Sequence, residues 1–281
     1  MHNEKDRGRV GTCLCCGELT TKQTTLTSGF LSRRAWGGEI EWSDTSRCLA
    51  CGFAFHGRGL SKEEVDAYYK AYRDENYFID RNSFEPFYTR KIHDDLECYM
   101  GSEARKYHLA SYLRKHDVSI FKENNDATVL DFAGGTGRLI SDLPGDKFVF
   151  DVSEEPPAPG VKSITEQNLR KMKFDLVVCA QMIEHATDPK NVAEKLFSMV
   201  KPGGHLYIEV PFNETWVDYS CPGRLRDLIL SFAKNNKWFN VAWDIYGTGF
   251  RVKLKVLPPL AFVPVREHLN YFTPKSLIAL G

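Results

Sequence analysis

Short apolar segments alternate with helical ones over residues 127–281, and this alternation constrains the fold more than any other feature of the sequence. Continuous apolar runs such as Leu176-Val177-Val178 are typical of strands that are covered on both faces. Strands joined by helices in this order form a parallel sheet. The expected strands are residues 128–132, 147–151, 161–165, 174–180 and 205–211. The sequence therefore predicts an α/β fold with a mostly parallel sheet.

The expected helices of this region have recognisable limits. Asp188-Pro189 supplies a capping side chain followed by proline at the first helical position. The same helix is expected to end in the turn Lys201-Pro202-Gly203-Gly204, before the last strand. Another helix is expected to start near Arg138, directly after a glycine-rich turn.

Two cysteine pairs near the N-terminus share the form Cys-x-x-Cys-Gly. Cys13 and Cys16 make the first pair, Cys48 and Cys51 make the second, and 31 residues separate the two motifs. Each pair can form a tight turn that presents two thiolates, and the glycine after it permits a positive φ. Four thiolates complete a tetrahedral Zn²⁺ site and leave no open position for catalysis. We therefore expect a structural zinc module.

Two other interpretations of these cysteines are a redox dithiol and a set of unrelated buried thiols. A thioredoxin-like motif needs one pair inside a βαβ unit, which this region lacks. Cys15 is a further candidate that can replace Cys13 or Cys16, although the spacing favours the outer two.

Length and charge limit the class of protein. The 281 residues suffice for one large α/β domain and a small accessory module. Lysine plus arginine equals aspartate plus glutamate at 37 each, and this balance argues against a nucleic-acid partner. No apolar run is long enough to span a membrane, and the polar segment 1–12 is not a secretory signal. We expect a cytoplasmic protein.

Composition divides the chain into three expected domains. Residues 1–60 form the four-cysteine zinc-binding, zinc-ribbon-like module, residues 61–120 a helical linker or substrate-side segment, and residues 121–281 the α/β domain. Ser61 and Glu64 form a capping box at the start of the helical segment.

For two aromatic-rich parts of the chain, the sequence leaves two alternative functions open. Residues 213–263 are a long insertion with an expected helix at 222–234, and they follow the carboxyl end of a strand, where ligands bind in such sheets. The insertion is either a substrate lid or partner surface, or an elaboration of the packing. A second group of rings either packs in a core or stacks on a sugar or base. Its members are Tyr68, Tyr69, Tyr72 and Tyr77.

The segment Asp131-Phe132-Ala133-Gly134-Gly135-Thr136-Gly137 leaves the first expected strand in a glycine-rich turn. Glycines there let the backbone approach a ligand closely. Asp151 closes the second strand, 20 residues after Asp131, and a carboxylate at that position can accept hydrogen bonds from both hydroxyls of a ribose. A nicotinamide-binding turn needs the spacing Gly-x-Gly-x-x-Gly, whereas the run from Gly135 ends on Ile140.

Two more segments complete a set of four motifs: Gln181-Met182-Ile183-Glu184-His185 after the fourth strand and Pro202-Gly203-Gly204 before the fifth. In order and spacing these motifs resemble the class I S-adenosylmethionine-dependent methyltransferase superfamily over residues 127–212. The resemblance implies a Rossmann-like sheet, S-adenosylmethionine as cofactor and transfer of its methyl group. Ala133 departs from the family, which usually has its first glycine there.

The same resemblance implies which residues line the cofactor. Its methionine end is expected to contact the glycine-rich turn, the ribose to contact Asp151 and the adenine edge to contact Glu166. Ala180 and Gln181 are expected beside the sulfonium, and His185 is generally structural in this family. The residues expected in the turn are Asp131, Ala133, Gly134, Gly135 and Gly137.

The order of the modules narrows the resemblance to zinc-containing sugar methyltransferases. Beyond the fifth strand, Arg266-Glu267-His268-Leu269-Asn270-Tyr271-Phe272-Thr273 is similar to a motif of sugar C-methyltransferases, in which a Glu-His pair serves proton transfer. The resemblance makes Glu267 and His268 candidate acid/base residues, with Tyr271 nearby. A histidine suits the removal of a proton from a hydroxyl or an enolised carbon. Alternatively, this segment only positions the helix that follows it.

The expected acceptor is a small molecule, a nucleotide-linked sugar in glycan or polysaccharide biosynthesis, with O- and C-methylation both open. An RNA methyltransferase with a zinc module is a second hypothesis, opposed by the zero net charge and by Val210-Pro211-Phe212 in place of an amino-methylation motif. A third is an inactive scaffold. In the family, the sheet ends in a hairpin that follows the helix starting at Thr273-Pro274. In this chain we expect either that strands within 249–265 replace the hairpin or that the hairpin is absent. In the second case, the exposed edge of the sheet favours pairing with a second copy.

Overall fold

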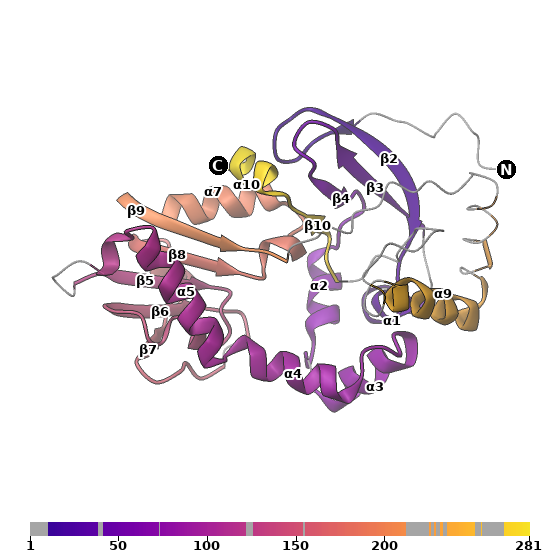
Figure 1. Ribbon diagram of the computed structural model, residues 1–281, viewed down its shortest axis with the longest axis horizontal. Helices are drawn as coiled ribbons and strands as arrows, with labels where there is room; N and C mark the ends of the chain where they lie inside the picture. The colour runs from indigo at the N-terminus through magenta and orange to yellow at the C-terminus, as the bar shows by residue number, and fades with distance from the viewer. Residues whose placement is uncertain are drawn as a thin grey trace. The chain divides into compact units, whose positions relative to one another are not determined.

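A computed structural model of the 281-residue chain describes most of the sequence. The described ranges are residues 11–38, 42–72, 74–121, 126–153, 155–211, 235–250 and 267–281, with Leu225, Leu228, Ser231, Phe232 and Leu254. The chain forms two compact units (Figure 1). The first combines residues 1–93, 184–187 and 212–280; the second combines residues 94–183 and 188–211 with Gly281.

An antiparallel sheet in the order β1-β2-β3-β4-β10 organises the first unit. Its strands are β1 (Gly11–Thr12), β2 (Leu19–Leu26), β3 (Trp42–Cys48), β4 (Ala54–His56) and β10 (Asn270–Tyr271). Strand β10 comes from the far end of the chain and pairs with β4, with Asn270 opposite Phe55 and Tyr271 opposite Ala54. The segment that contains Glu267 and His268 therefore leads directly into the sheet of the cysteine module.

Helices of the first unit begin where the sequence supplies caps. The Ser61 hydroxyl accepts the N–H of Glu64, and the Glu64 carboxylate accepts the N–H of Ser61 at 2.8 Å, which confirms the capping box. Phe30 of α1 contacts Tyr77 of α3 edge-to-face, with ring centroids 5.1 Å apart, and both side chains are buried. The helices are α1 (Gly29–Trp36), α2 (Lys62–Tyr69), α3 (Glu75–Phe84), α9 (Lys237–Gly249) and α10 (Pro274–Leu280).

A parallel sheet in the order β7-β6-β5-β8-β9 organises the second unit and confirms the predicted α/β fold. Its strands are β5 (Thr128–Phe132), β6 (Asp146–Phe150), β7 (Val161–Ser163), β8 (Phe174–Ala180) and β9 (Val200–Glu209). Helix α4 (Arg90–Met100) leads into this unit from the first. The other elements are α5 (Glu103–Lys115), α6 (Glu166–Leu169), α7 (Pro189–Met199) and the 3₁₀ turns η2 (Ser119–Phe121), η3 (Arg138–Ile140) and η4 (Ile183–His185).

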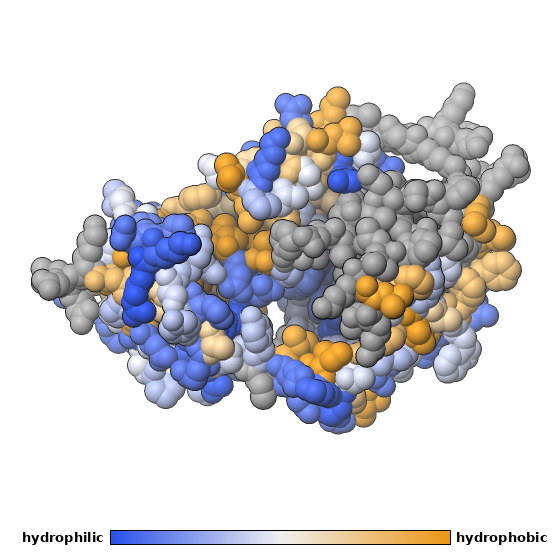
Figure 2. All heavy atoms as spheres, viewed as in Figure 1, coloured by the Kyte–Doolittle hydropathy of each residue, from blue (hydrophilic) through white to orange (hydrophobic). Residues whose placement is uncertain are grey.

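The parallel sheet is covered on both faces, as its apolar runs predict. Val129 and Leu176 pack in a cluster with Leu109 of α5. Their neighbours Leu130 and Val177 point to the opposite face and pack with residues of α6 and α7. Viewed from the side of α5, this unit presents mostly hydrophilic residues, because α5 turns its apolar stripe inward (Figure 2).

Strands β6 and β7 differ from their expected ranges by one or two residues, and two larger differences lie at Arg138 and at the start of β9. Only the 3₁₀ turn η3 forms where a helix was expected from Arg138, and Pro144 follows it closely, which disfavours continued helix before it. Strand β9 already begins at Val200, so Pro202-Gly203-Gly204 belongs to the strand. The β8–β9 pairing is irregular between Phe174 and Leu176, which accommodates these residues inside the ladder.

Candidate functional site

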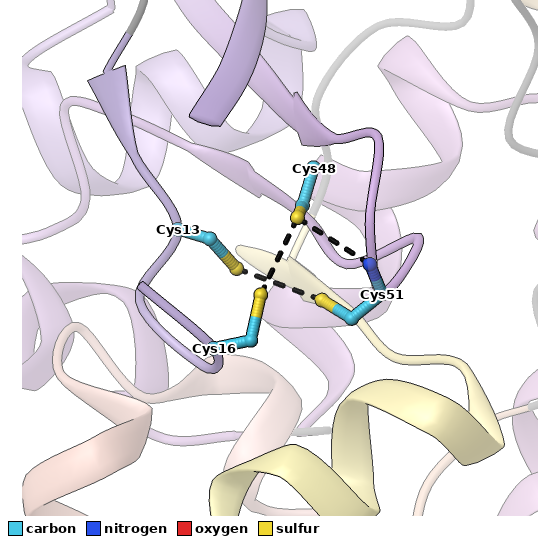
Figure 3. A group of neighbouring side chains, drawn as sticks. All are labelled: Cys13, Cys16, Cys48 and Cys51. Carbon is cyan, nitrogen blue, oxygen red and sulfur yellow. Dashed lines mark hydrogen bonds between the residues drawn. The ribbon is translucent and has the colours of Figure 1, made fainter. Parts of the chain in front are cut away.

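Four cysteine sulfurs converge at one point of the first unit (Figure 3). The Sγ atoms of Cys13 and Cys51 lie 3.6 Å apart, and those of Cys16 and Cys48 lie 3.5 Å apart. All four sulfurs lie within 4.8 Å of one another. A tetrahedral ion with metal–sulfur distances of about 2.3 Å needs sulfurs about 3.8 Å apart. The four thiols therefore fit a tetrahedral four-thiolate metal site.

The backbone around the sulfurs has the form that such turns require. Gly17 and Gly52 follow the two cysteine pairs with φ of 76° and 77°. The N–H of Cys51 donates to the sulfur of Cys48 at 3.4 Å. Burial acts to raise the pKa of the Cys48 thiol, but the N–H groups of Cys51 and Ala50 outweigh it and hold that pKa at about 7. This arrangement favours a thiolate at Cys48.

Cys15 lies outside the four-sulfur group. Its side chain is buried, and burial raises the pKa of its thiol well above the usual value. The structure thus brings together the two outer cysteines of the first motif, Cys13 and Cys16.

The C-terminal segment supports the second cysteine turn. The Thr273 hydroxyl donates to the carbonyl of Cys51 at 2.6 Å, and the Lys275 ammonium donates to the carbonyl of Ala50 at 2.7 Å. The cysteine module and the start of α10 are therefore tied together by hydrogen bonds.

The carboxyl ends of the parallel strands meet at one edge of the second unit, where ligands bind in open α/β sheets. Asp131 lies on β5 and is 1% exposed, whereas Asp151 directly follows β6. Ala180 ends β8 and Glu209 ends β9. Four of the strand ends therefore supply carboxylates or backbone groups to this edge.

The turn after β5 faces the carboxylate that closes β6. Ala133 and Gly137 have φ of 57° and 72°, and Gly135 between them has φ of 59°. The N–H of Ala133 donates to the carbonyl of Phe150 at 2.7 Å, and the N–H of Gly135 donates to Oδ2 of Asp151 at 2.8 Å. A left-handed alanine is strained, and such strain is often found at ligand-binding loops.

Asp131 is held close to the glycine-rich turn. A Cβ atom on Gly134 would lie 2.1 Å from Cγ of Asp131, so only glycine fits there. Neither carboxylate oxygen of Asp131 has a hydrogen-bond partner among the described residues. Burial raises the pKa of Asp131 to about 7; nearby Arg105 opposes the rise, and Asp151 and Glu209 reinforce it.

A charged network that the sequence did not indicate surrounds the end of β9. Arg105 of α5, with 5% of its side chain exposed, donates to Oε1 of Glu209 at 2.8 Å. Gln181 donates to the same oxygen at 3.2 Å, and the Tyr207 hydroxyl donates to Oε2 at 2.9 Å. Gln181 also has a positive φ of 58°. The available sequence signal was Glu209, a charge at the end of an apolar strand.

An open groove of about 430 Å³ borders this network on the second unit. Arg105, Tyr112, Tyr207 and Glu209 are among the residues that line it. Glu166 stands apart from them as the first residue of α6, where its half-exposed carboxylate accepts from Arg170 at 2.7 Å.

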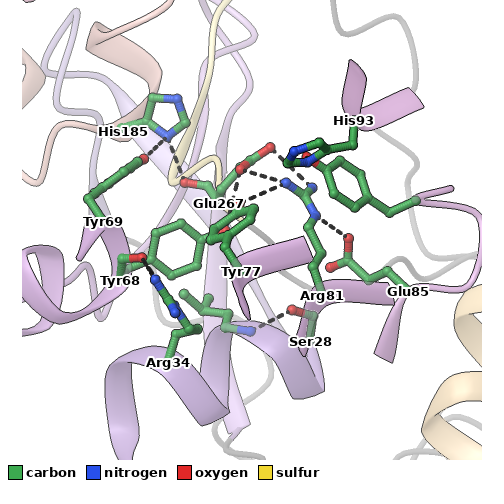
Figure 4. Close-up of polar contacts among 12 residues, drawn as sticks. Ser28, Arg34, Tyr68, Tyr69, Tyr77, Arg81, Glu85, His93, His185 and Glu267 are labelled. Carbon is green, nitrogen blue, oxygen red and sulfur yellow. Dashed lines mark hydrogen bonds and ion pairs between the residues drawn. The ribbon is translucent and has the colours of Figure 1, made fainter. Parts of the chain in front are cut away.

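In the first unit, Glu267 is bound on both carboxylate oxygens (Figure 4). Arg81 of α3 donates to Oε2 at 3.2 Å and to Oε1 at 3.3 Å, and the Tyr68 hydroxyl donates to Oε2 at 3.3 Å. Burial acts to raise the pKa of Glu267, but Arg81, His268 and His185 lower it well below its usual range. Glu267 is therefore a firmly ionised carboxylate.

Arg81 is itself enclosed by partners. Its Nε donates to Oε2 of Glu85 at 3.0 Å, and Nη1 donates to the Tyr77 hydroxyl at 3.0 Å. Its guanidinium carbon lies 4.1 Å from the centroid of the Tyr88 ring. The pair with Glu85 is local, four positions along α3, whereas the pair with Glu267 had no local sequence signal, because 186 positions separate the two residues.

The tyrosines of the helical segment divide into two groups. Tyr68 and Tyr77 are 1% and 0% exposed and pack edge-to-face on Phe30, so the interpretation as core packing describes these two. Tyr72 is 38% exposed, and the Tyr69 hydroxyl lies 2.9 Å from Nδ1 of His185.

The two histidines of the candidate site lie ring against ring. The centroids of His185 and His268 are 4.9 Å apart, and Nδ1 of His185 lies 2.9 Å from the carbonyl oxygen of Glu267. The hydroxyl of Tyr271 lies 3.3 Å from Nε2 of the buried His56. His268 and His185 thus form a pair, whereas Tyr271 contacts a different imidazole.

Much of the long insertion and its expected strands falls outside the described residues. This holds for the expected helix at 222–234, apart from Leu225, Leu228, Ser231 and Phe232, and for the strands considered within 249–265, apart from Gly249, Phe250 and Leu254. The described helix α9 carries Trp238, which is 75% exposed. Among the described residues, no helix has the length and apolar character needed to cross a membrane.

Comparison with known proteins assigns the family. A family model for the methyltransferase domain matches residues 103–280, which is more than half of the chain. The chain belongs to this methyltransferase-domain family, and the resemblance to class I S-adenosylmethionine-dependent methyltransferases is confirmed.

Curated relatives match over shorter stretches. A ubiquinone biosynthesis O-methyltransferase of Acinetobacter baumannii (strain AYE) is 28% identical over 98 residues, covering 28% of this chain and 41% of the relative. The enzyme of that name from Photorhabdus laumondii subsp. laumondii is 36% identical over 115 residues, covering 34% of this chain and 46% of the relative. The chain thus spans less than half the length of these two relatives.

Solved structures resemble the chain only weakly. A putative methyltransferase from Bacillus halodurans is 17% identical with a TM-score of 0.34, covering 61% of this chain and 65% of that one. The plantazolicin methyltransferase BpumL, solved with a desmethylPZN analog and SAH, is 14% identical with a TM-score of 0.35, covering 59% and 65%. The family assignment rests on the domain match alone.

Proposed function

We propose that this chain transfers a methyl group from S-adenosylmethionine to a sugar, with a nucleotide-linked sugar of glycan or polysaccharide biosynthesis as the favoured acceptor. The hydrogen bond from the Gly135 N–H to Asp151 supports the methyl-donor part of the proposal, because it brings the turn after β5 and the carboxylate after β6 to one point. The sugar acceptor is proposed from the resemblance of the Glu267-His268 segment to sugar methyltransferases. Membership of the methyltransferase-domain family supports the reaction type.

The cofactor-binding residues follow from this edge of the sheet. Asp151 accepts hydrogen bonds from the ribose hydroxyls, and Asp131 offers its buried charge to the ammonium of the methionine end. Glu166 at the adenine edge, and Ala180 with Gln181 beside the sulfonium, complete the proposed set. Bound there, S-adenosylmethionine supplies an electrophilic methyl group. The task left to the chain is to align the acceptor and manage its proton.

For the proton, His268 is the better candidate of the predicted pair. Glu267 is held ionised by Arg81 and Tyr68, so it is poorly suited to exchange a proton near neutral pH. We infer that Glu267 supports the charge that His268 acquires. Methylation of an oxygen and methylation of a carbon both require that this base remove a proton from the acceptor.

The four-cysteine group is proposed to hold structural Zn²⁺. Four sulfurs at tetrahedral spacing support this assignment, and a full set of thiolates leaves no position for a substrate. The ion would fix the turns of the antiparallel sheet, to which β10 and the segment after it are bonded.

The acceptor is tested by incubating the full chain with S-adenosylmethionine and a panel of nucleotide sugars, with mass spectrometry as the readout. The expected result is the gain of one methyl group on at least one sugar, abolished in Asp151→Ala. Methylation of no sugar, despite measurable cofactor binding, would reject the sugar as acceptor.

The names of the curated relatives favour a second acceptor class, the hydroxyl groups of ubiquinone-biosynthesis intermediates. Phenolic hydroxyls belong in the same panel for that reason. Their methylation in place of the sugars would move the proposal to this class and leave the cofactor site unchanged.

A further inference from the structure

A second cluster of ligand-type side chains lies in the first unit, away from the cysteines. One ligand atom each from Glu184, His185 and His268 lies within 4.8 Å of the other two. Oε1 of Glu184 is 3.9 Å from Nε2 of His185, and the two imidazole rings have centroids 4.9 Å apart. Glu184 is 1% exposed, whereas His185 and His268 are half-buried.

The tautomer of His185 follows from its contacts. Nδ1 lies 2.9 Å from the carbonyl oxygen of Glu267, and a carbonyl oxygen can only accept. Nδ1 therefore carries the proton, with the Tyr69 hydroxyl 2.9 Å from the same atom. The lone pair of the neutral ring is then on Nε2, the atom on the side of Glu184. Histidines that bind metals commonly donate their other N–H to a carbonyl in this way.

The backbone that carries the three side chains is pinned by hydrogen bonds. The N–H of Leu269 donates to the carbonyl of Glu184 at 2.9 Å. The Asn270 side chain donates to the carbonyl of Ala186 at 2.6 Å, and the Thr187 hydroxyl donates to the carbonyl of Leu60 at 2.7 Å. Segments 184–187 and 267–270 are therefore held together independently of the three ligand atoms.

We propose that Glu184, His185 and His268 form a binding site for one divalent transition-metal ion. Two imidazoles and one carboxylate are a donor set that suits Zn²⁺, Co²⁺ or Fe²⁺ and disfavours Mg²⁺ and Ca²⁺, which prefer oxygen. Metal–ligand distances of about 2.0–2.2 Å place ligand atoms about 3.3–3.6 Å apart, whereas Glu184 and His185 are 3.9 Å apart, so small rotations of both half-buried imidazoles, His185 and His268, would be needed to close the site. Three protein ligands leave positions open for water or an acceptor oxygen.

This site goes beyond the proposed function, because ion binding requires neither an acceptor nor methyl transfer. It would change one role in that function. A coordinated His268 has no free lone pair and could not act as the base. The ion would instead lower the pKa of a bound hydroxyl, whose proton would pass to water.

The test is metal stoichiometry by equilibrium dialysis of the full chain against Zn²⁺ and, separately, Co²⁺, followed by elemental analysis. Wild type is expected to bind two ions per chain. His268→Ala and Glu184→Gln are expected to bind one, with affinity for the second ion reduced more than about 100-fold, because even indirect partners of a metal contribute about 10–100-fold. His116→Ala, which removes an exposed imidazole on the second unit, is the matched control and should bind two.

The Co²⁺ spectrum separates the two sites within one sample. The four-cysteine site gives a thiolate-to-cobalt charge-transfer band, and the second ion should add absorption without such a band. That band also shows that a variant keeps its fold. If Glu184→Gln does not fold, the test rests on His268→Ala. One ion per wild-type chain, or two ions in folded His268→Ala, would overturn the site and leave a histidine–glutamate ion pair. Neither outcome bears on cofactor binding, because no cofactor is present in the assay.

Discussion

At the scale of single residues, Asp131 is buried where a carboxylate is costly, and its pKa of about 7 measures that cost. Against its usual 3.8, this pKa corresponds to about 4 kcal/mol that favours the protonated form in the folded state. The folded pKa lies above the unfolded one, so the wild type loses stability as the pH rises from about 4 to 7. Above pH 7 the loss is complete.

Asp131→Asn should therefore raise the free energy of unfolding at pH 8 by up to about 4 kcal/mol, with a smaller gain at pH 5. The same variant should bind S-adenosylmethionine more weakly, because the charge proposed for the ammonium is gone. Denaturant unfolding at the two pH values and calorimetry provide the measurements. Asp142→Asn, at an exposed carboxylate beside Lys106, is the control and should change stability by less than about 1 kcal/mol. An equal gain in the free energy of unfolding at pH 5 and at pH 8 would contradict the raised pKa of Asp131.

Arg81 supports Glu267 from a distant part of the sequence. Arg81→Met leaves that carboxylate buried without its main cation and should destabilise the chain by about 3–5 kcal/mol. Arg81→Met combined with Glu267→Gln should recover part of the loss, since the stranded charge is removed. Thermal unfolding measures both. Arg170→Met, which breaks an exposed pair on α6, should leave the unfolding midpoint unchanged. No recovery in the double variant would show that Arg81 acts through packing alone.

At the scale of elements, the cysteine turns stabilise the sheet that ends in β10. Cys51→Ser should remove one thiolate ligand, replace the four-thiolate cobalt charge-transfer band with a weaker one at shorter wavelength, and lower the unfolding midpoint of the first unit, because metal binding contributes directly to folding. Cys15→Ser is the matched control, since Cys15 is buried beside the cluster but outside it, and it should keep the band. Loss of the band in Cys15→Ser with retention in Cys51→Ser would show that the ligand set is wrong.

The elements that were predicted well from the sequence are those whose limits are set by residues within or next to the element. Apolar runs define the buried strands β5 and β8, and the Asp188-Pro189 cap starts α7 as expected. The helix expected from Arg138 is reduced to one 3₁₀ turn, with Pro144 close behind it. The strand β9 takes in glycines that resemble a turn, because they lie in the irregular stretch of the ladder between the Phe174–Val200 and Leu176–His205 pairs.

At the scale of the whole molecule, local motifs identified the two cysteine pairs and the glycine-rich turn, since the residues within each motif are close in sequence. The pairs of Arg105 with Glu209 and of Arg81 with Glu267 escaped prediction because 104 and 186 positions separate their members. Such pairs are created by the fold, and a single sequence carries no signal for them. The joining of β10 to β4 is of the same kind, as 215 positions separate the two strands at Asn270 and Phe55.

We propose that the turn after β5 and the carboxylate after β6 hold one adenosyl ligand. Calorimetric titration of S-adenosylmethionine tests it most directly, with Asp151→Ala compared with Asp146→Ala at the opposite, exposed end of β6. Wild type and Asp146→Ala should bind one ligand with equal affinity. Asp151→Ala should bind about 100-fold more weakly or worse, since two hydrogen bonds to a charged group are worth about 3–6 kcal/mol. Equal affinity of Asp151→Ala and wild type would contradict the claim.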